Sequence, residues 1–276
     1  MADDSSAYVL PALPRCIARA IGCALGFSAL ALSPTPVSAS ENDADRGLYL
    51  RLGAGVQWPQ TERLRDQDCA STTPPALFGC GSGEDGQPLG ALGSFRQSPT
   101  LDAALGYRWT SWLRTEALVN WSPQLDWQGQ ANFLGAGSNQ PVTATGRSLA
   151  GFGVVLVDAP EVIGVRPYLG AGLGAASIAI ADITFGFPAK GPSAETVVKG
   201  GTSQSLATLL TAGVAIPLSD RLALDLSYRW MDLGQLKTPK GTAIITRPQR
   251  RARLGIGGTQ VDLKTQAVIG SLRFRF

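Results

Sequence analysis

The stretch from Asp220 to Met231, DRLALDLSYRWM, alternates apolar residues with polar or small ones over its whole length. Because successive side chains of an extended strand point to opposite faces, this period of two predicts a β-strand with one apolar and one charged face. Either face could be the buried one in a soluble sandwich. One face carries charges of both signs, and the other carries leucines followed by aromatic residues. This favours a membrane barrel, in which lipid contacts the leucines and the lumen holds the charges.

Composition neither supports nor opposes this interpretation. The chain has 276 residues and 44% apolar content, which is ordinary for a soluble protein, but barrel strands carry a weak hydropathy signal because half of each strand faces a polar interior. A net charge of +3 gives no basic excess that would indicate nucleic-acid binding. The absence of His excludes Ser-His and Cys-His nucleophile pairs and His-ligated zinc, so we expect no catalytic residue, no metal site and no cofactor.

The amino-terminal segment has the layout of an export signal. Arg15 and Arg19 precede an apolar run over residues 20–32, and the small residues Val37-Ser38-Ala39 follow it. This predicts a cleavable signal peptide over residues 1–39 and a short linker over residues 40–46. A lipoprotein processing site at Gly22-Cys23 is the weaker alternative, because much of the apolar run follows it.

Two cysteines, Cys69 and Cys80, remain after the expected cleavage. An isolated pair in a polar segment of an exported protein most simply forms a disulfide, since the compartment outside the inner membrane is oxidising. A metal site is the weaker alternative, because a tight thiolate site needs more Cys or a His.

The two-residue alternation recurs from residue 47 to residue 276, interrupted by segments rich in Gly, Pro, Ser and Asn. Long and short interruptions alternate, as in strands that run up and down across a membrane. We predict an all-β, up-and-down antiparallel transmembrane barrel over 47–276, with eight strands, or ten if a long connection hides a hairpin. The expected strands are 47–58, 101–109, 113–121, 148–157, 165–180, 204–216, 220–231 and 264–276, and the expected long extracellular loops are 59–99, 122–146, 182–201 and 233–262.

Two of these segments carry finer expectations. Residues 242–246 are a candidate for a hairpin that continues the strands beyond the membrane. Gly170, Gly172 and Gly174 leave the inward face of one strand nearly bare, which could make room for Arg side chains from neighbouring strands. The same glycines resemble a fragment of a phosphate-binding loop, but no Lys or helix start follows them.

The carboxyl-terminal residues SLRFRF, which end on Phe276, resemble the assembly signal that the barrel-insertion machinery reads. Together with GLYLRLGAGV at 47–56 and LDLSYRWMDLG at 224–234, they make the chain similar to the OmpA-like, opacity-type family of small outer-membrane barrels. The resemblance implies a place in the cell outer membrane, surface exposure, and adhesion or envelope stability rather than chemistry.

The charged face of the predicted strands supplies a lumen network. We expect a polar plug, because an eight-stranded interior is just wide enough for side chains to fill. A narrow anion-preferring channel is the alternative, because Arg dominates the set. The expected network is Arg51, Asp102, Arg108, Arg114, Glu116, Asp225, Arg229, Arg273 and Arg275.

Enzymatic function is disfavoured. Glu116 or Asp225 could in principle serve a hydrolase, but no nucleophile stands beside a base in the pattern. A lipid A deacylase or an outer-membrane protease of this architecture would usually need a His, and the sequence has none.

Aromatic residues gather at the ends of the predicted strands, where a girdle at the membrane interface belongs. A soluble sandwich would instead bury them near the middle of each strand. The expected girdle is Trp58, Trp109, Trp112, Trp121, Tyr228, Trp230 and Phe274, with Tyr107 and Phe276 beside it.

A basic cluster in the last long loop comprises Arg247, Arg250, Arg251 and Arg253. The favoured interpretation is a solvated loop, or contact of its guanidinium groups with lipopolysaccharide phosphates just outside the membrane. Docking of an acidic host polymer or other surface ligand is the second. The expected partners are thus outer-membrane lipid, lipopolysaccharide, the insertion machinery and a ligand at the loops, with no nucleic acid, and the expected state is a monomer.

Overall fold

The computed structural model describes residues 46–137 and 139–276, so the expected signal peptide and all but the last residue of the expected linker lie outside the described residues. The described chain is all-β, with fourteen strands in one antiparallel sheet and a short 3-10 helix, η2 (Pro188–Lys190). In this part of the chain no helix has the length and apolar character needed to cross a bilayer.

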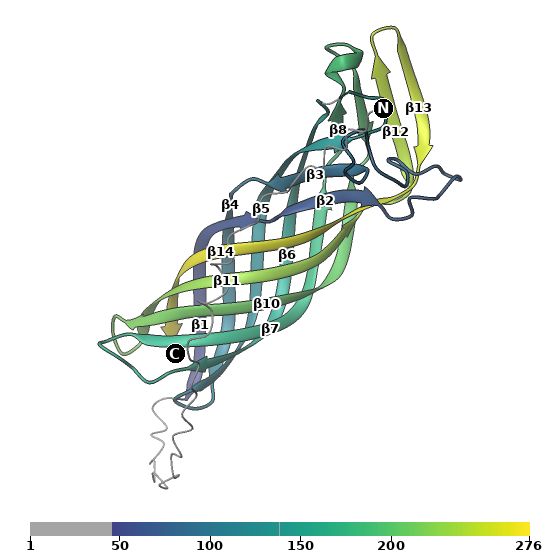
Figure 1. The fold of residues 1–276 in the computed structure, drawn as a ribbon. Helices are drawn as coiled ribbons and strands as arrows, with labels where there is room; N and C mark the ends of the chain where they lie inside the picture. Colours follow the sequence, from purple (N-terminus) through teal and green to yellow (C-terminus); the bar gives the residue numbers. More distant parts are fainter. Residues whose placement is uncertain (1–45, 138) are drawn as a thin grey trace, which may run out of the picture. The chain divides into compact units, whose positions relative to one another are not determined.

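Eight strands pair in a closed ring, which is visible in Figure 1. Each is antiparallel to its two neighbours, and β1 pairs with both β4 and β14, so the ring has no free edge. In ring order they are β1 (Gly47–Pro59), β4 (Ser98–Arg108), β5 (Leu113–Asn132), β6 (Pro141–Asp158), β7 (Arg166–Ile180), β10 (Gly201–Pro217), β11 (Leu222–Lys237) and β14 (Thr259–Arg275).

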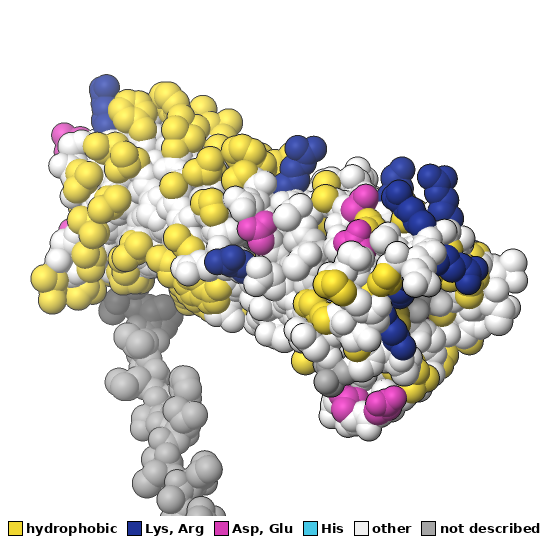
Figure 2. Space-filling view, turned by 90° about the horizontal axis from the view of Figure 1, so that it is seen from above, with side chains coloured by type: hydrophobic (Ala, Val, Ile, Leu, Met, Phe, Trp, Pro, Cys, Tyr) yellow, Lys and Arg dark blue, Asp and Glu magenta, His cyan; other side chains and the backbone are white. Residues whose placement is uncertain are grey.

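Near the carboxyl terminus, the outer face of the ring is apolar. Leu50 on β1, Leu105 on β4 and Leu226 on β11 are among the exposed large side chains. Figure 2 shows hydrophobic side chains spread over this part, on the left of the view, while most Lys and Arg side chains project from the other part. Nine residues separate Trp112 from Trp121. At about 3.3 Å per residue and a tilt of about 40°, this interval spans a height of about 23 Å, close to the apolar band of a membrane barrel.

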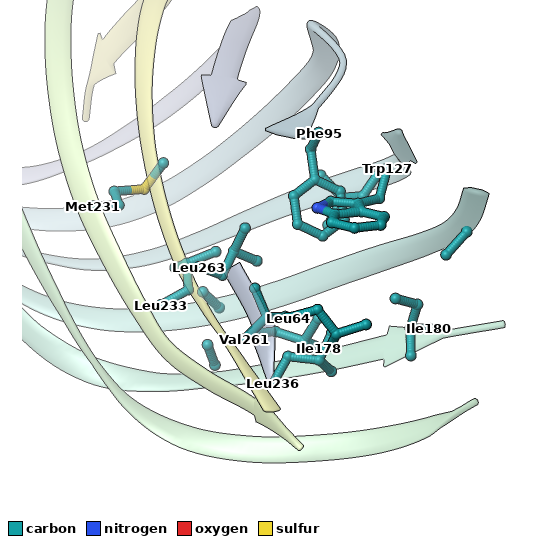
Figure 3. Close-up of a cluster of buried hydrophobic side chains, with 14 of the residues drawn as sticks. Leu64, Phe95, Trp127, Ile178, Ile180, Met231, Leu233, Leu236, Val261 and Leu263 are labelled. Carbon is teal, nitrogen blue, oxygen red and sulfur yellow. The ribbon is translucent and has the colours of Figure 1, made fainter. Parts of the chain in front are cut away.

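Further along the same strands the pattern inverts, and the interior becomes apolar. On β14 the inward positions change from Arg273 and Ser271 to Leu263 and Val261, and on β11 from Asp225 to Leu236. Outside a membrane the strands face water, so their interior must supply the hydrophobic stabilisation. Figure 3 shows this apolar core, which includes Leu64, Phe95, Trp127, Ile178, Met231, Leu233 and Leu263.

The segments expected as long loops contain six further strands, so the sheet has fourteen strands, eight of them in the closed ring, and one of the six covers the hairpin candidate at 242–246. The residues at 122–146 mostly extend β5 and β6. Strands beyond the lipid need no apolar outer face, so the alternation that marks the others is missing from their sequences. The added strands are β2 (Thr61–Asp66), β3 (Gly90–Phe95), β8 (Ile183–Gly186), β9 (Glu195–Val198), β12 (Gly241–Arg247) and β13 (Arg250–Ile256).

The connection between β2 and β3 is tied down by two devices. Cys69 and Cys80 form the expected disulfide. The Asp66 carboxylate accepts hydrogen bonds from the backbone N–H groups of Leu77, Phe78 and Gly79 at 2.8–2.9 Å. Phe78 in turn stacks on Phe133, which joins this loop to the end of β5. The loop is therefore fixed both covalently and through buried contacts.

A bulge shifts the register of β11 against β14 between Asp232 and Gln235. Gly234 lies within it at φ +76°, and its N–H donates to the Asp232 carboxylate at 2.8 Å. A backbone in this left-handed region favours glycine. The bulge lies where the inward face becomes fully apolar, between Leu233 and Leu236.

Candidate functional site: the charged interior of the barrel

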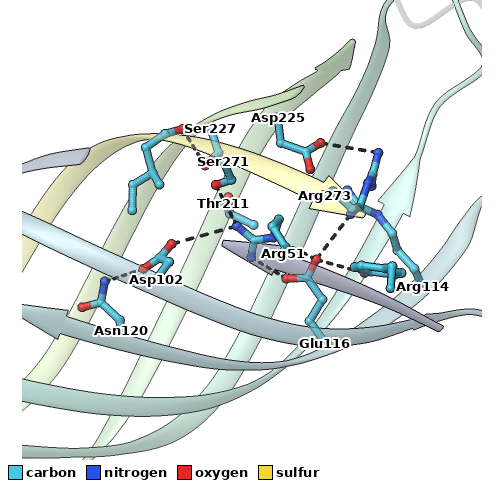
Figure 4. A network of polar contacts seen from close by, with 12 residues as sticks. Arg51, Asp102, Arg114, Glu116, Asn120, Thr211, Asp225, Ser227, Ser271 and Arg273 are labelled. Carbon is cyan, nitrogen blue, oxygen red and sulfur yellow. Dashed lines mark hydrogen bonds and ion pairs between the residues drawn. The ribbon is translucent and has the colours of Figure 1, made fainter. Parts of the chain in front are cut away.

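The charges occupy inward positions on several strands of the ring. Arg51 lies on β1, Arg114 and Glu116 on β5, and Asp225 and Arg229 on β11, and all five are buried. The period of two sends each of them inward, because the residues on either side of it face outward. Figure 4 shows the side chains of Arg51, Arg114, Glu116 and Asp225 converging inside the barrel.

Arg51 and Glu116 form the central ion pair. The Arg51 Nη2 lies 2.5 Å from Glu116 Oε2, and Arg51 Nε donates to Oε1 at 3.2 Å. The Tyr49 hydroxyl also donates to Oε1, at 2.9 Å, and Arg114 Nη1 lies 3.4 Å from it. Glu116 is therefore held by two guanidinium groups and a phenol.

Three further carboxylates complete the network. Asp102 pairs with Arg229 and accepts a 2.8 Å hydrogen bond from Asn120 Nδ2. Asp225 lies 3.5 Å from Arg273 Nη2.

The Asp158 carboxylate, at the end of β6, accepts hydrogen bonds from Arg108 Nη2 at 2.8 Å and from Arg114 Nε at 2.9 Å. The sequence prediction missed Asp158 because it ended that strand at residue 157. Tyr49 and Tyr168 are also buried beside these charges, and the expected network did not include them. The Arg114 guanidinium lies 4.6 Å from the Tyr168 ring centroid.

Arg275 is the predicted network member that lies furthest out. It is partly exposed near the carboxyl terminus, whereas Arg273 has a side chain only 11% exposed. The inner set therefore has five guanidinium groups and four carboxylates. The arginines are Arg51, Arg108, Arg114, Arg229 and Arg273, and the carboxylates are Asp102, Glu116, Asp158 and Asp225. The barrel interior is nearly neutral, with one positive charge in excess.

The glycines of β7 do not make room for arginine, which corrects one expectation. A Cβ at Gly172 would meet the Val154 side chain at 3.0 Å, and one at Gly170 would meet Leu156 and Thr211, each at 3.0 Å. These glycines instead allow apolar side chains of β6 to fill that wall of the lumen. Gly106 and Gly213 do leave room for residues beside the network, because the Tyr49 ring lies over Gly106 and the Tyr168 ring lies over Gly213.

The space left inside is small. A cavity of about 10 Å³ lies between Arg51, Tyr168 and Arg229, enough for about one water molecule. The buried apolar core fills the interior further along the strands. At the mouth near the carboxyl terminus a wider cavity of about 410 Å³ opens. It is lined by Tyr49, Arg108, Glu161, Arg166, Asp220, Arg221, Arg273 and Arg275, among others.

The predicted girdle residues fall into two groups along the strands. One group, near the short turns, is Tyr107, Trp109, Trp112, Phe274 and Phe276. The other is Trp58, Trp121, Tyr228 and Trp230. In the second group, Trp58 Nε1 and the Tyr228 hydroxyl both donate to Gln266 Oε1, at 3.2 and 2.7 Å. Trp58 and Trp230 are only partly exposed, and the other seven are mostly well exposed.

The predicted basic cluster lies on the β12–β13 hairpin, and its members differ in their exposure and contacts. Arg247 is held in place: its Nη1 donates to the backbone carbonyl of Glu195 at 3.0 Å, and its guanidinium lies 4.7 Å from the Phe187 ring centroid. Arg250, Arg251 and Arg253 are exposed on β13. Among the described residues, no ion pair involves these three.

An antiparallel sheet that closes on itself, apolar outside and charged inside over the same strands, is the arrangement of a transmembrane β-barrel. The chain belongs to the outer membrane protein beta-barrel domain family, whose model matches residues 27–276. This match confirms the resemblance to small outer-membrane barrels that the strand motifs and Phe276 indicate.

Solved structures of outer-membrane proteins are similar to the chain at low identity. Neisserial surface protein A is 15% identical with a TM-score of 0.39, over 83% of this chain and 97% of that one. OprG from Pseudomonas aeruginosa is 16% identical with a TM-score of 0.44, over 84% and 97%. The outer membrane protease OmpT from Escherichia coli is 7% identical with a TM-score of 0.40, over 83% and 97%. A search of curated proteins finds no match.

Proposed function

We propose that the protein is a non-enzymatic outer-membrane barrel that stabilises the envelope and displays its extended strands and loops at the cell surface. The observation that carries this proposal is the closed interior: arginine–carboxylate pairs fill the lipid-level part, and an apolar core fills the part beyond it. Such an interior lets little solute pass through the barrel, and it holds the projecting strands rigidly.

The carboxylates of the site support a structural rather than a catalytic role. Glu116 is bound by Arg51 and Arg114, and Asp158 by Arg108 and Arg114. Carboxylate oxygens that are engaged by guanidinium groups in a filled interior are not placed to take a proton from a substrate. Among the described residues, no group of acidic residues or cysteines could hold a metal ion.

Surface display is tested by shaving intact cells with trypsin. We expect cleavage at Arg250 and Arg251, which are exposed on the projecting hairpin, and no cleavage at the buried Arg51 or Arg229. Cleavage at residues 250–251 only after the cells are broken open would contradict surface display.

A narrow anion-preferring channel is the second candidate, favoured by the excess of arginine over carboxylate and by the arginines of the mouth cavity. Planar-bilayer recording separates the two. A plug predicts negligible conductance for the wild type and also for Arg229→Ala, because that substitution enlarges the 10 Å³ cavity but leaves the apolar core in place beyond it. An anion-selective wild-type conductance that falls in Arg229→Ala would favour the channel.

A further inference from the structure

The β12–β13 hairpin leaves one edge of the sheet open. In the order of strands, β13 is last and pairs only with β12, whereas β12 is also covered on its other side by β9, over Ala243–Thr246. Figure 1 shows the two strands projecting together from the far end of the sheet. Extended strands with an unpaired edge are templates for a further strand.

This edge is held ready by contacts at the base and tip of the hairpin. Arg247 donates to the Glu195 carbonyl and lies over Phe187, and Gly191 of the η2 segment lies against Pro248 at the tip. At the base, the Gly257 N–H donates to the Pro75 carbonyl at 2.8 Å. The hairpin is therefore preorganised, which lowers the entropic cost of docking.

The hairpin geometry determines which backbone groups point outward. Arg247 pairs with Arg250 across a two-residue turn, and such a closing pair exchanges both hydrogen bonds. The next pair, Thr246 with Arg251, is then not hydrogen-bonded, and the same holds for Ile244 with Arg253. The N–H and C=O groups of Arg251 and Arg253 thus face the open edge.

The side chains along this edge specify a partner of definite chemistry. Arg251 and Arg253 lie on one face of β13, with no carboxylate partner among the described residues. Ala252 and Leu254 lie on the other face, and Leu254 is 46% exposed. Residues directly opposite one another in a sheet have Cβ atoms about 5 Å apart. A strand with acidic residues opposite the two arginines and apolar residues between them would satisfy both faces.

The position of the edge favours such a partner over membrane phosphates. From Trp230, in the second aromatic group, the chain runs through the rest of β11 and all of β12 before it reaches Arg250. At about 3.3 Å per residue this is more than about 40 Å of extended chain.

We propose that the open edge of β13 is a docking site for an acidic polypeptide segment with alternating acidic and apolar residues, which adds to the sheet as an antiparallel strand. The inference goes beyond the proposed surface display and relies on it only for access in the cell. Main-chain hydrogen bonds supply affinity in this mode, and the alternate side chains supply specificity.

The test uses the purified protein in detergent and a fluorescent peptide of alternating Asp and Val, followed by anisotropy. The double variant Arg251→Gln plus Arg253→Gln is expected to bind about tenfold more weakly, because it loses two cross-strand ion pairs. The charge-matched control is Arg96→Gln plus Arg147→Gln, which changes two arginines outside the hairpin and should bind like the wild type. Equal binding by both double variants would overturn the proposal.

Backbone N-methylation of the peptide separates strand addition from simple charge attraction. In the proposed register the Asp residues form the hydrogen-bonded pairs with Arg251 and Arg253. N-methylation at Asp should therefore abolish binding, and N-methylation at Val should leave it nearly unchanged. If both methylated peptides bind, or neither does, strand addition is excluded. Because this experiment needs no cells, its failure is distinct from a failure of surface display in the trypsin experiment.

Discussion

Arg51 on β1 and Glu116 on β5 form a two-point ion pair across β4, the strand that separates them in the sheet. The contact is possible because the barrel curves, so that inward side chains of non-adjacent strands converge. The ion pair therefore depends on closure of the ring, and its loss should destabilise the whole barrel.

Glu116→Gln should destabilise the barrel strongly. The substitution keeps the shape of the side chain but leaves Arg51 and Arg114 short of a buried negative charge, which typically costs about 3–5 kcal/mol. The free energy of unfolding in urea, with the barrel in lipid vesicles, measures this effect. The matched control is Glu62→Gln at the partly exposed pair with Lys264, which should cost less than about 1 kcal/mol. Similar losses in the two variants would contradict a special role for the interior pair.

Gly234→Ala should destabilise the bulge in β11. Gly234 lies at φ +76°, and an added Cβ would meet the Ser205 side chain at 2.7 Å and the Leu206 carbonyl oxygen at 2.8 Å. Left-handed strain alone costs about 1–2 kcal/mol, and the clash adds to it. Gly151→Ala is the matched control, because nothing lies within 4 Å of its Cβ. The same unfolding measurement compares them, and a neutral Gly234→Ala would refute the argument.

Asp66→Asn should loosen the disulfide loop without affecting the barrel. Oδ2 of Asp66 accepts from both Phe78 and Gly79, so an amide NH₂ at that position would face two donors. We expect faster hydrogen exchange at residues 77–79. Asp68→Asn serves as the control, because Asp68 accepts a single exposed hydrogen bond from the Ala70 N–H, which an amide oxygen can also accept. Unchanged exchange at residues 77–79 would show that the Asp66 hydrogen bonds do not hold the loop.

The contact between Asp85 and Asn132 should weaken in acid. Hydrogen bonds from the Gln87 N–H and then from Asn132 Nδ2 hold the pKa of Asp85 below its ordinary value of 3.8. Because the pKa is lowered in the folded protein, the contribution of this contact is fully present above the unfolded-state pKa. It is lost as the pH falls below that value through the folded pKa. The amide shifts of Gln87 and Asn132 should report this change, and Asp85→Asn should abolish it. A midpoint at or above the ordinary value would contradict the direction.

The sequence by itself determined the barrel strands, because lipid outside and charge inside impose a period of two that can be read directly, as at Leu224, Asp225 and Leu226. It also indicated eight of the nine charged residues that make up the inner network, and the cysteine pair.

Only the tertiary structure decided the rest. β2, β3, β8 and β9 are short strands beyond the membrane and carry no clear period, and the hairpin of β12 and β13 was expected from the sequence only at 242–246. The partners of each charge depend on closure of the ring: Asp158 joins Arg108 and Arg114 only because β6 pairs with β5 in the observed register. A strand pattern states which face a side chain takes, but it does not state which side chains from distant strands will meet there.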